Sequence, residues 1–74
     1  MGKMLSEMVA DDILMMIIME KRFSPGQRLP SENDLSAELN VSRSTLREAI
    51  RILSTRNVLE IKRGKGTLLE LIWI

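Results

Sequence analysis

The chain has 74 residues, enough for one small domain with a thin hydrophobic core. It contains no cysteine and no histidine, which excludes disulfides, zinc-finger ligand sets and histidine-based catalysis. The longest apolar run, Ile13 to Met19, is too short to span a membrane. We therefore expect a soluble cytoplasmic domain without membrane contact, metal or cofactor.

The charge of the chain is unevenly distributed. Residues 1–42 carry four basic and seven acidic side chains, a net charge of −3, whereas residues 43–65 carry seven basic and two acidic side chains, a net charge of +5. Glu70 brings the total to +1. A basic segment of this kind favours a polyanionic partner, with a solvated charged face as the alternative.

Residues 6–22 are predicted to form a helix with Ser6 as its N-cap. The stripe that should face the core consists of Val9, Ile13, Met16 and Ile17. A second apolar group falls on the opposite side and consists of Leu14, Met15 and Ile18. Because a domain of this size has one core, this second group either contacts another chain or domain, or is tolerated at the surface.

A turn and a second helix follow. Residues 24–27 (SPGQ) have the signature of a type II turn, with proline second and glycine third. Residues 28–29 are expected to be extended, because the residue before Pro30 is disfavoured in a helix. Ser31 should cap a second helix that ends near Leu39.

Asn40 is expected to end the second helix, because asparagine tolerates the left-handed conformation of a tight turn. Ser42 should then cap a third helix from Arg43 to about Arg56, and Asn57 should end it in the same way. Two helices joined by a turn of this length indicate a helix-turn-helix.

The end of the chain predicts a β-hairpin. Residues 58–62 and 67–71 are rich in apolar residues and flank the glycine-rich, basic segment 63–66 (RGKG). That segment is not a nucleotide-binding P-loop, because Leu59 and Gly66 stand where the motif needs glycine and a hydroxyl residue. The predicted fold class is mostly α with a small β-hairpin: a winged helix-turn-helix of three helices plus a two-stranded wing.

The third helix has two distinct faces at 100° per residue. The apolar face consists of Leu46, Ala49, Ile50 and Leu53, and the outward face of Arg43, Ser44, Arg47 and Arg51. An arginine near a helix N-terminus can enter the major groove and donate two hydrogen bonds to guanine. Ser42 and Thr45, with the free amides of the first turn, can hold phosphates. The alternative is a set of surface arginines that serve solubility.

Residues 24–67, more than half of the chain, closely resemble the winged helix-turn-helix domain of the GntR family of bacterial transcription regulators. The matching positions, in order and with family spacing, are Pro25-Gly26, Leu29-Pro30-Ser31-Glu32, Leu35, Val41-Ser42-Arg43, Thr45, Arg47-Glu48-Ala49, Leu53 and Gly64-Lys65-Gly66-Thr67. Three positions depart from the family. Asn33 stands where many members have arginine, which puts one base contact in doubt, and Asn40 and Asn57 stand where glycine is usual.

The resemblance implies three groups of operator-contacting residues. They are the start of the second helix (Ser31, Glu32, Asn33), the recognition helix (Ser42, Arg43, Ser44, Thr45, Arg47) and the wing (Arg63, Gly64, Lys65). It also implies a homodimeric regulator on a two-fold operator. Residues 1–74 would be a single-domain fragment that lacks a C-terminal domain for a small-molecule effector.

The predicted function is therefore sequence-specific binding of double-stranded DNA by the operator-reading domain of a transcription regulator. A winged helix used for protein–protein assembly is the main alternative, and a small-molecule enzyme or nucleotide-binding domain is the second. We expect no catalysis, because the carboxylates are scattered and no nucleophile–base pair is evident.

Overall fold

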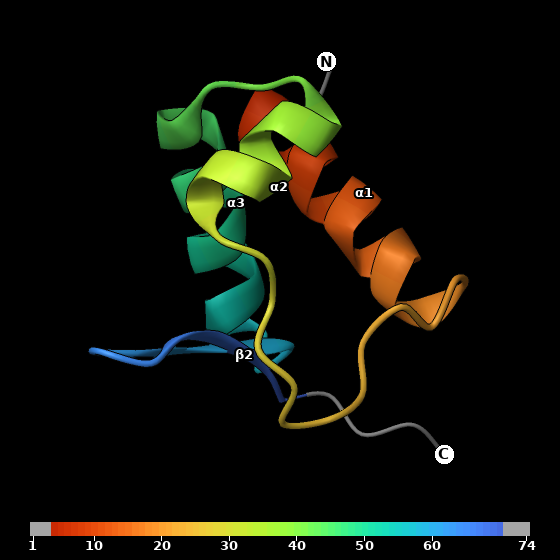
Figure 1. Cartoon of the computed structure of the whole chain (residues 1–74). Coiled ribbons are helices and arrows are strands. Elements are labelled where there is room, and N and C mark those ends of the chain that lie inside the picture. The colour runs from red at the N-terminus through yellow and green to blue at the C-terminus, as the bar shows by residue number, and fades with distance from the viewer. Residues whose placement is uncertain (1–3, 71–74) are drawn as a thin grey trace.

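The structure is a computed structural model, and it describes residues 4–70. Three helices precede an antiparallel hairpin: α1 (Leu5–Ile18), α2 (Glu32–Leu39), α3 (Arg43–Thr55), β1 (Leu59–Lys62) and β2 (Gly66–Leu69). Both α1 and α2 pack on α3, and the hairpin lies at the C-terminal end of α3 (Figure 1). The predicted winged helix-turn-helix is confirmed.

The start of α1 differs from the prediction. Met4, not Ser6, is the N-cap residue, and its backbone N–H donates a hydrogen bond to Glu7 Oε1 at 3.2 Å. A carboxylate in the first turn thus satisfies a backbone donor at the start of the helix, and no side-chain oxygen of an N-cap residue does so. The predicted core stripe is confirmed, since Val9, Ile13, Met16 and Ile17 are all buried.

α1 ends at Ile18, four residues before the predicted end at Arg22. Lys21 adopts a left-handed backbone conformation, with φ of 51°, and this turns the chain out of the helix. Phe23 then returns to the core, where only 6% of its surface is exposed. Burial of this aromatic ring offsets the cost of a left-handed lysine.

The turn and the second helix form as predicted. The N–H of Gln27 donates to the carbonyl of Ser24 at 2.9 Å, and Gly26 has the positive φ of 83° that a type II turn requires at its third position. At the start of α2, the Ser31 hydroxyl accepts a hydrogen bond from the N–H of Asp34 at 3.2 Å.

Both predicted left-handed asparagines are confirmed. Asn40 has φ of 56°, its N–H donates to the carbonyl of Ala37, and the N–H of Val41 donates to Ser36 at 3.0 Å. This pair of bonds is a Schellman motif, which satisfies the last carbonyls of a helix. Asn57 has φ of 61° and ends α3 with the equivalent pair of bonds.

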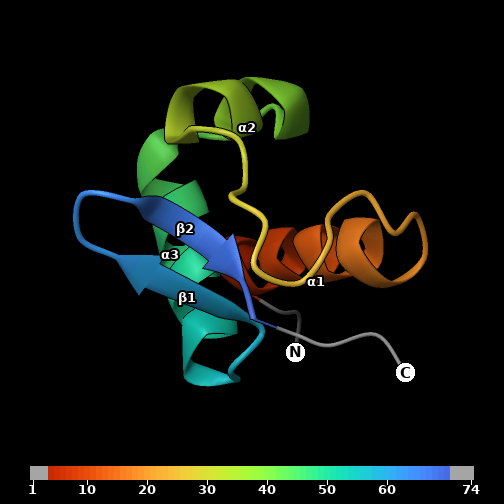
Figure 2. The ribbon, with the colours of Figure 1, turned by 60° about the horizontal axis from the view of Figure 1, so that its bottom comes forward.

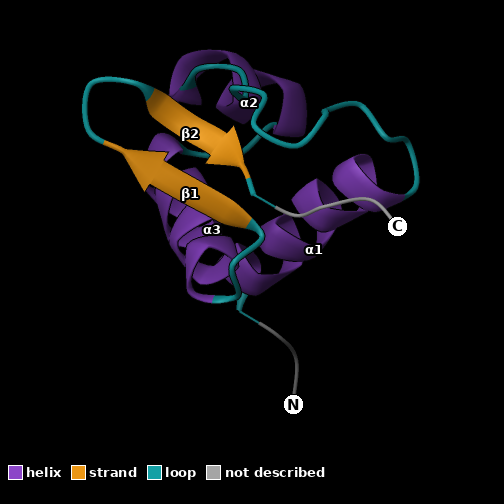
Figure 3. Cartoon of the chain, turned by 90° about the horizontal axis from the view of Figure 1, so that it is seen from below, coloured by secondary structure: helices purple, strands orange, loops and turns teal. Residues whose placement is uncertain are grey.

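The wing pairs Leu59 with Leu69 and Lys62 with Gly66. Each strand begins within one residue of its predicted start, while the predicted end of the second strand, Leu71, lies outside the described residues. Figures 2 and 3 show that β2 is the strand nearer to α2, and β1 contacts α3.

A further segment lies along the other edge of β2. The N–H of Leu29 donates to the carbonyl of Thr67 at 2.8 Å, and the N–H of Leu69 donates to the carbonyl of Gln27 at 2.9 Å. Arg28 is therefore paired with Leu68 in an isolated antiparallel bridge. The extended segment predicted before Pro30 covers the edge of the wing and fixes the wing to the start of α2.

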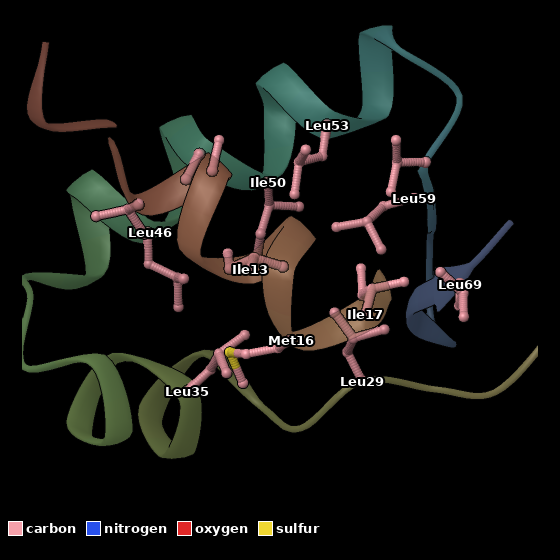
Figure 4. Close-up of a cluster of buried hydrophobic side chains, with 14 of the residues drawn as sticks. Ile13, Met16, Ile17, Leu29, Leu35, Leu46, Ile50, Leu53, Leu59 and Leu69 are labelled. Atoms are coloured by element: carbon pink, nitrogen blue, oxygen red, sulfur yellow. The ribbon is translucent and has the colours of Figure 1, made fainter. Parts of the chain in front are cut away.

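The hydrophobic core joins all five elements. Figure 4 shows side chains from α1, α2, α3 and both strands meeting in one cluster. The largest fully buried side chains are Ile13, Ile17, Leu35, Leu46, Leu53, Leu59 and Leu69. A single core of this kind fixes the position of α3 relative to α2 and the wing, and so sets the geometry of the surface described next.

Candidate nucleic-acid interface

Hydroxyl groups gather at the N-terminus of α3. The Ser42 hydroxyl accepts a hydrogen bond from the N–H of Thr45 at 3.2 Å, as predicted for a helix cap. It also donates to Thr45 Oγ1 at 2.9 Å and lies 3.2 Å from the Ser44 hydroxyl. Backbone amides and hydroxyls that face outward at a helix N-terminus are suited to a phosphate.

The two predicted faces of α3 are confirmed. Its apolar face is buried against the other helices and consists of Leu46, Ala49, Ile50 and Leu53. Arg43, Arg47 and Arg51 are exposed on the remaining surface. The helix therefore presents a row of cations to solvent while its other side anchors it in the core.

Side chains at the start of α2 hold two of these arginines. Arg43 Nη1 donates a hydrogen bond to Asn33 Oδ1 at 3.2 Å, and Arg47 Nε donates to Glu32 Oε1 at 3.1 Å. The second contact is also an ion pair between exposed groups. The structure thus brings together the predicted residues of α2 and α3, although they are 10 and 15 positions apart in the sequence.

The wing tip carries the remaining predicted residues. Arg63, Gly64 and Lys65 are exposed, Gly64 has φ of 79°, and the N–H of Lys65 closes the turn on the carbonyl of Lys62 at 3.1 Å. The tip projects on the side of the molecule opposite to the C-terminal end of α1 (Figure 2).

Two hollows of about 200 Å³ each separate the wing from the helices. Both are lined by Glu32, Ile50, Ile61 and Thr67. Arg47 and Arg51 line one of them. The start of α2, the cationic side of α3 and the strands of the wing therefore border one concave region.

The match to known proteins spans nearly the same segment as the fold. Residues 5–69 match the family model described as "Bacterial regulatory proteins, gntR family". The chain belongs to the GntR family. Among curated relatives, it is 41% identical over 63 residues to the HTH-type transcriptional repressor NanR of Citrobacter rodentium, a match that covers 85% of this chain and 24% of that protein.

Solved structures give the same assignment. A Streptococcus agalactiae GntR superposes with a TM-score of 0.82 at 45% identity, over 88% of this chain and 31% of that one. The AraR DNA-binding domain, solved in complex with operator ORR3, superposes with a TM-score of 0.80 at 32% identity, over 93% of this chain and 82% of that one. The chain spans about a quarter of the length of the curated relatives it matches first.

Arg28 is a further candidate DNA-contacting residue of this GntR domain, and it was not among the predicted site residues. Its side chain crosses Gly66 so closely that a Cβ on that glycine would lie 3.0 Å from Arg28 Nε. Within residues 4–70 its guanidinium has no hydrogen bond or ion pair, and it lines the hollow beside the wing. The charge of Arg28 was visible in the sequence, but its place beside the wing depends on pairing with β2.

Metal-ion clusters and membrane-spanning helices are both absent from the described part of this GntR domain. Residues 4–70 contain no group of three acidic, histidine or cysteine side chains placed to hold a metal ion. None of the helices in that range is long and apolar enough to cross a bilayer.

Proposed function

We propose that this GntR domain binds double-stranded DNA with sequence preference, as the operator-reading domain of a transcription regulator. The observation that carries the proposal is the convergence of Arg43 and Arg47 of α3, both held from α2, beside a basic wing. Support also comes from the AraR DNA-binding domain, which has the same fold and was solved on operator DNA.

The proposed DNA contacts are the three predicted groups. They consist of Ser31, Glu32 and Asn33 of the α2 start, Ser42, Arg43, Ser44, Thr45 and Arg47 of the α3 start, and Arg63, Gly64 and Lys65 of the wing. α3 would enter the major groove, where arginine recognises guanine. Hydroxyls and first-turn amides would bind phosphate, and the wing would supply charge to phosphate or the minor groove.

The proposal extends to the whole regulator. The domain would belong to a longer cytoplasmic protein, with a further domain that binds a small-molecule effector and with two copies on a two-fold operator. We assign it no catalytic activity, in keeping with a family of regulatory proteins.

Selection of bound sequences from a random double-stranded DNA library tests the central proposal. We expect enrichment of a short motif, and a DNA affinity that falls steeply with salt because bound lysines and arginines release counterions. Recovery of random sequences, or no binding even at low salt, would refute the proposal and favour the protein–protein assembly module.

The dimer is tested separately. A lone module makes few phosphate contacts, so linking two copies should strengthen binding to a two-fold site. Fusion of the domain to an unrelated dimeric protein should increase affinity for the selected site by more than about tenfold. Equal affinities of the fused and single domains would show that dimer geometry does not matter here.

A further inference from the structure

The side chain of Asn33 contacts Arg43, a proposed base-recognising residue on another helix. It is the second residue of α2, and Arg43 is the first residue of α3. The carboxamide oxygen of Asn33 accepts a hydrogen bond from Arg43 Nη1 at 3.2 Å. Both side chains are exposed, so the bond joins two groups on the surface proposed to face DNA.

The geometry points to Asn33 as a positioning residue for Arg43 rather than as a base-reading residue. This inference rests on the proposed DNA-binding function. A guanidinium has five N–H donors in one plane. When Asn33 accepts one of them from Nη1, the Nε–Nη2 edge remains available, and its two parallel donors match the O6 and N7 acceptors of guanine.

Arg47 shows the contrast. It is held through Nε by the carboxylate of Glu32, so its terminal Nη1–Nη2 edge is the one left available. The two arginines therefore present different edges of their guanidinium groups to the same surface. Asn33 is neutral, and it orients Arg43 without cancelling the charge that attracts DNA.

A direct role for Asn33 in base recognition would have a different signature. The specific pairing of asparagine with adenine uses the carboxamide oxygen and nitrogen together. The oxygen of Asn33 is already bound to Arg43. The oxygen has a second lone pair, so the contact with Arg43 does not by itself block adenine. A base-reading Asn33 would set the preference at an adenine, whereas a positioning Asn33 acts at the guanine that Arg43 recognises, so the two roles predict changes at different base pairs.

The test compares base preferences of variants by library selection. Asn33→Ala should reduce discrimination roughly threefold to tenfold at the same base pair that Arg43→Ala affects, since one orienting hydrogen bond is lost. Asn33→Asp keeps an acceptor oxygen and should keep the preference at that base pair, while its added negative charge lowers affinity for all DNA. A change at a different base pair, or no change in preference, would overturn the inference.

A double-mutant cycle gives the second readout. If Asn33 acts through Arg43, Asn33→Ala should have no further effect on base preference when Arg43→Ala is already present. Additive effects would show an independent contact and overturn the inference. Thermal unfolding of each variant checks that α2 is intact, because a destabilised helix would weaken binding to all sequences without moving the preferred base.

The result for the wild-type chain distinguishes failure of the proposed DNA-binding function from failure of the inference about Asn33. If the wild-type chain selects a motif that Arg43→Ala relaxes, the proposed function stands, and the Asn33 variants alone decide the inference. If the wild-type chain selects no motif, the proposed function fails and the inference fails with it.

Discussion

Arg22 and Glu38 join the loop after α1 to the last turn of α2. Both terminal nitrogens of the Arg22 guanidinium donate hydrogen bonds to the two carboxylate oxygens of Glu38. The guanidinium also lies over the ring of Phe23, 5.5 Å from its centroid. This exposed pair therefore fixes the end of α1 against α2 from outside the core.

The pair predicts a dependence of stability on pH. The hydrogen bond from Arg22 lowers the pKa of Glu38 below its ordinary value of 4.5, so folding favours the charged carboxylate. The resulting stabilisation is present above pH 4.5 and is lost as the pH falls through the pKa of Glu38 in the folded state. Glu38→Gln should lower the unfolding free energy slightly at pH 7 and not at pH 2.

Chemical denaturation of the unchanged chain and of the Glu38→Gln variant, at pH values from about 2 to about 7, measures the effect. Glu48→Gln is the matched control, because Glu48 is also exposed on a helix and forms no ion pair with any residue between 4 and 70. Equal effects of the two substitutions at pH 7 would contradict a specific role for the Arg22–Glu38 pair.

The second prediction separates base recognition from charge. Arg43→Ala should weaken binding to the selected site by about 1–3 kcal/mol and should relax the base preference at one base pair per half-site. Lys65→Ala should weaken binding to selected and random DNA about equally, and should lower the salt slope by roughly one unit. Titrations of both variants on both DNAs at several salt concentrations decide this. If Arg43→Ala weakens both DNAs equally, Arg43 does not recognise a base.

The third prediction concerns Arg28, whose guanidinium crosses Gly66, the first residue of β2 after the wing tip. Arg28→Ala should reduce affinity for all DNA sequences and lower the salt slope by roughly one unit, because it removes a cation beside the proposed path of a DNA strand. Lys21→Ala is the control, since Lys21 is an exposed cation in the loop after α1. That loop lies on the side of the molecule opposite to the wing tip (Figure 2). Identical salt slopes for the two variants would place Arg28 outside the interface.

The fourth prediction tests the left-handed helix ends. Alanine is strained at φ of 56°, so Asn40→Ala should reduce the unfolding free energy by about 1 kcal/mol. Asn40→Gly should be nearly neutral, because glycine relieves the strain but makes the unfolded chain more flexible. Denaturant unfolding distinguishes them, and a glycine variant as unstable as the alanine variant would point to a role for the asparagine side chain instead.

The fifth prediction concerns the apolar side of α1 that faces solvent. Met15 is 53% exposed and Ile18 is 40% exposed, as expected for the second apolar group, while Leu14 is half-buried against the core. We expect the isolated domain to self-associate at about millimolar concentration, and Met15→Glu to weaken that association. Light scattering that shows a strict monomer of the unchanged chain at that concentration would contradict this.

Local sequence signals determined the secondary structure and most of the candidate site. The apolar spacing of α3, the Ser31 and Ser42 caps and the left-handed Asn40 each depend on a few neighbouring residues, and each forms as predicted. The same signals placed the basic residues at the start of α3 and at the hairpin tip. Such features need no knowledge of the rest of the fold, because helix period and capping chemistry act within one or two turns.

Only the tertiary structure decided which of these residues meet. The pairing of Arg28 with β2 and the hydrogen bond from Arg43 to Asn33 join segments that no local pattern connects. The end of α1 also depends on tertiary contacts. The spacing of apolar residues predicted a longer helix, but the chain leaves the helix before Lys21, and Phe23 is buried in the core. These contacts depend on how one small core orients three helices and a wing, and this is why the sequence predicted the elements but not the partners.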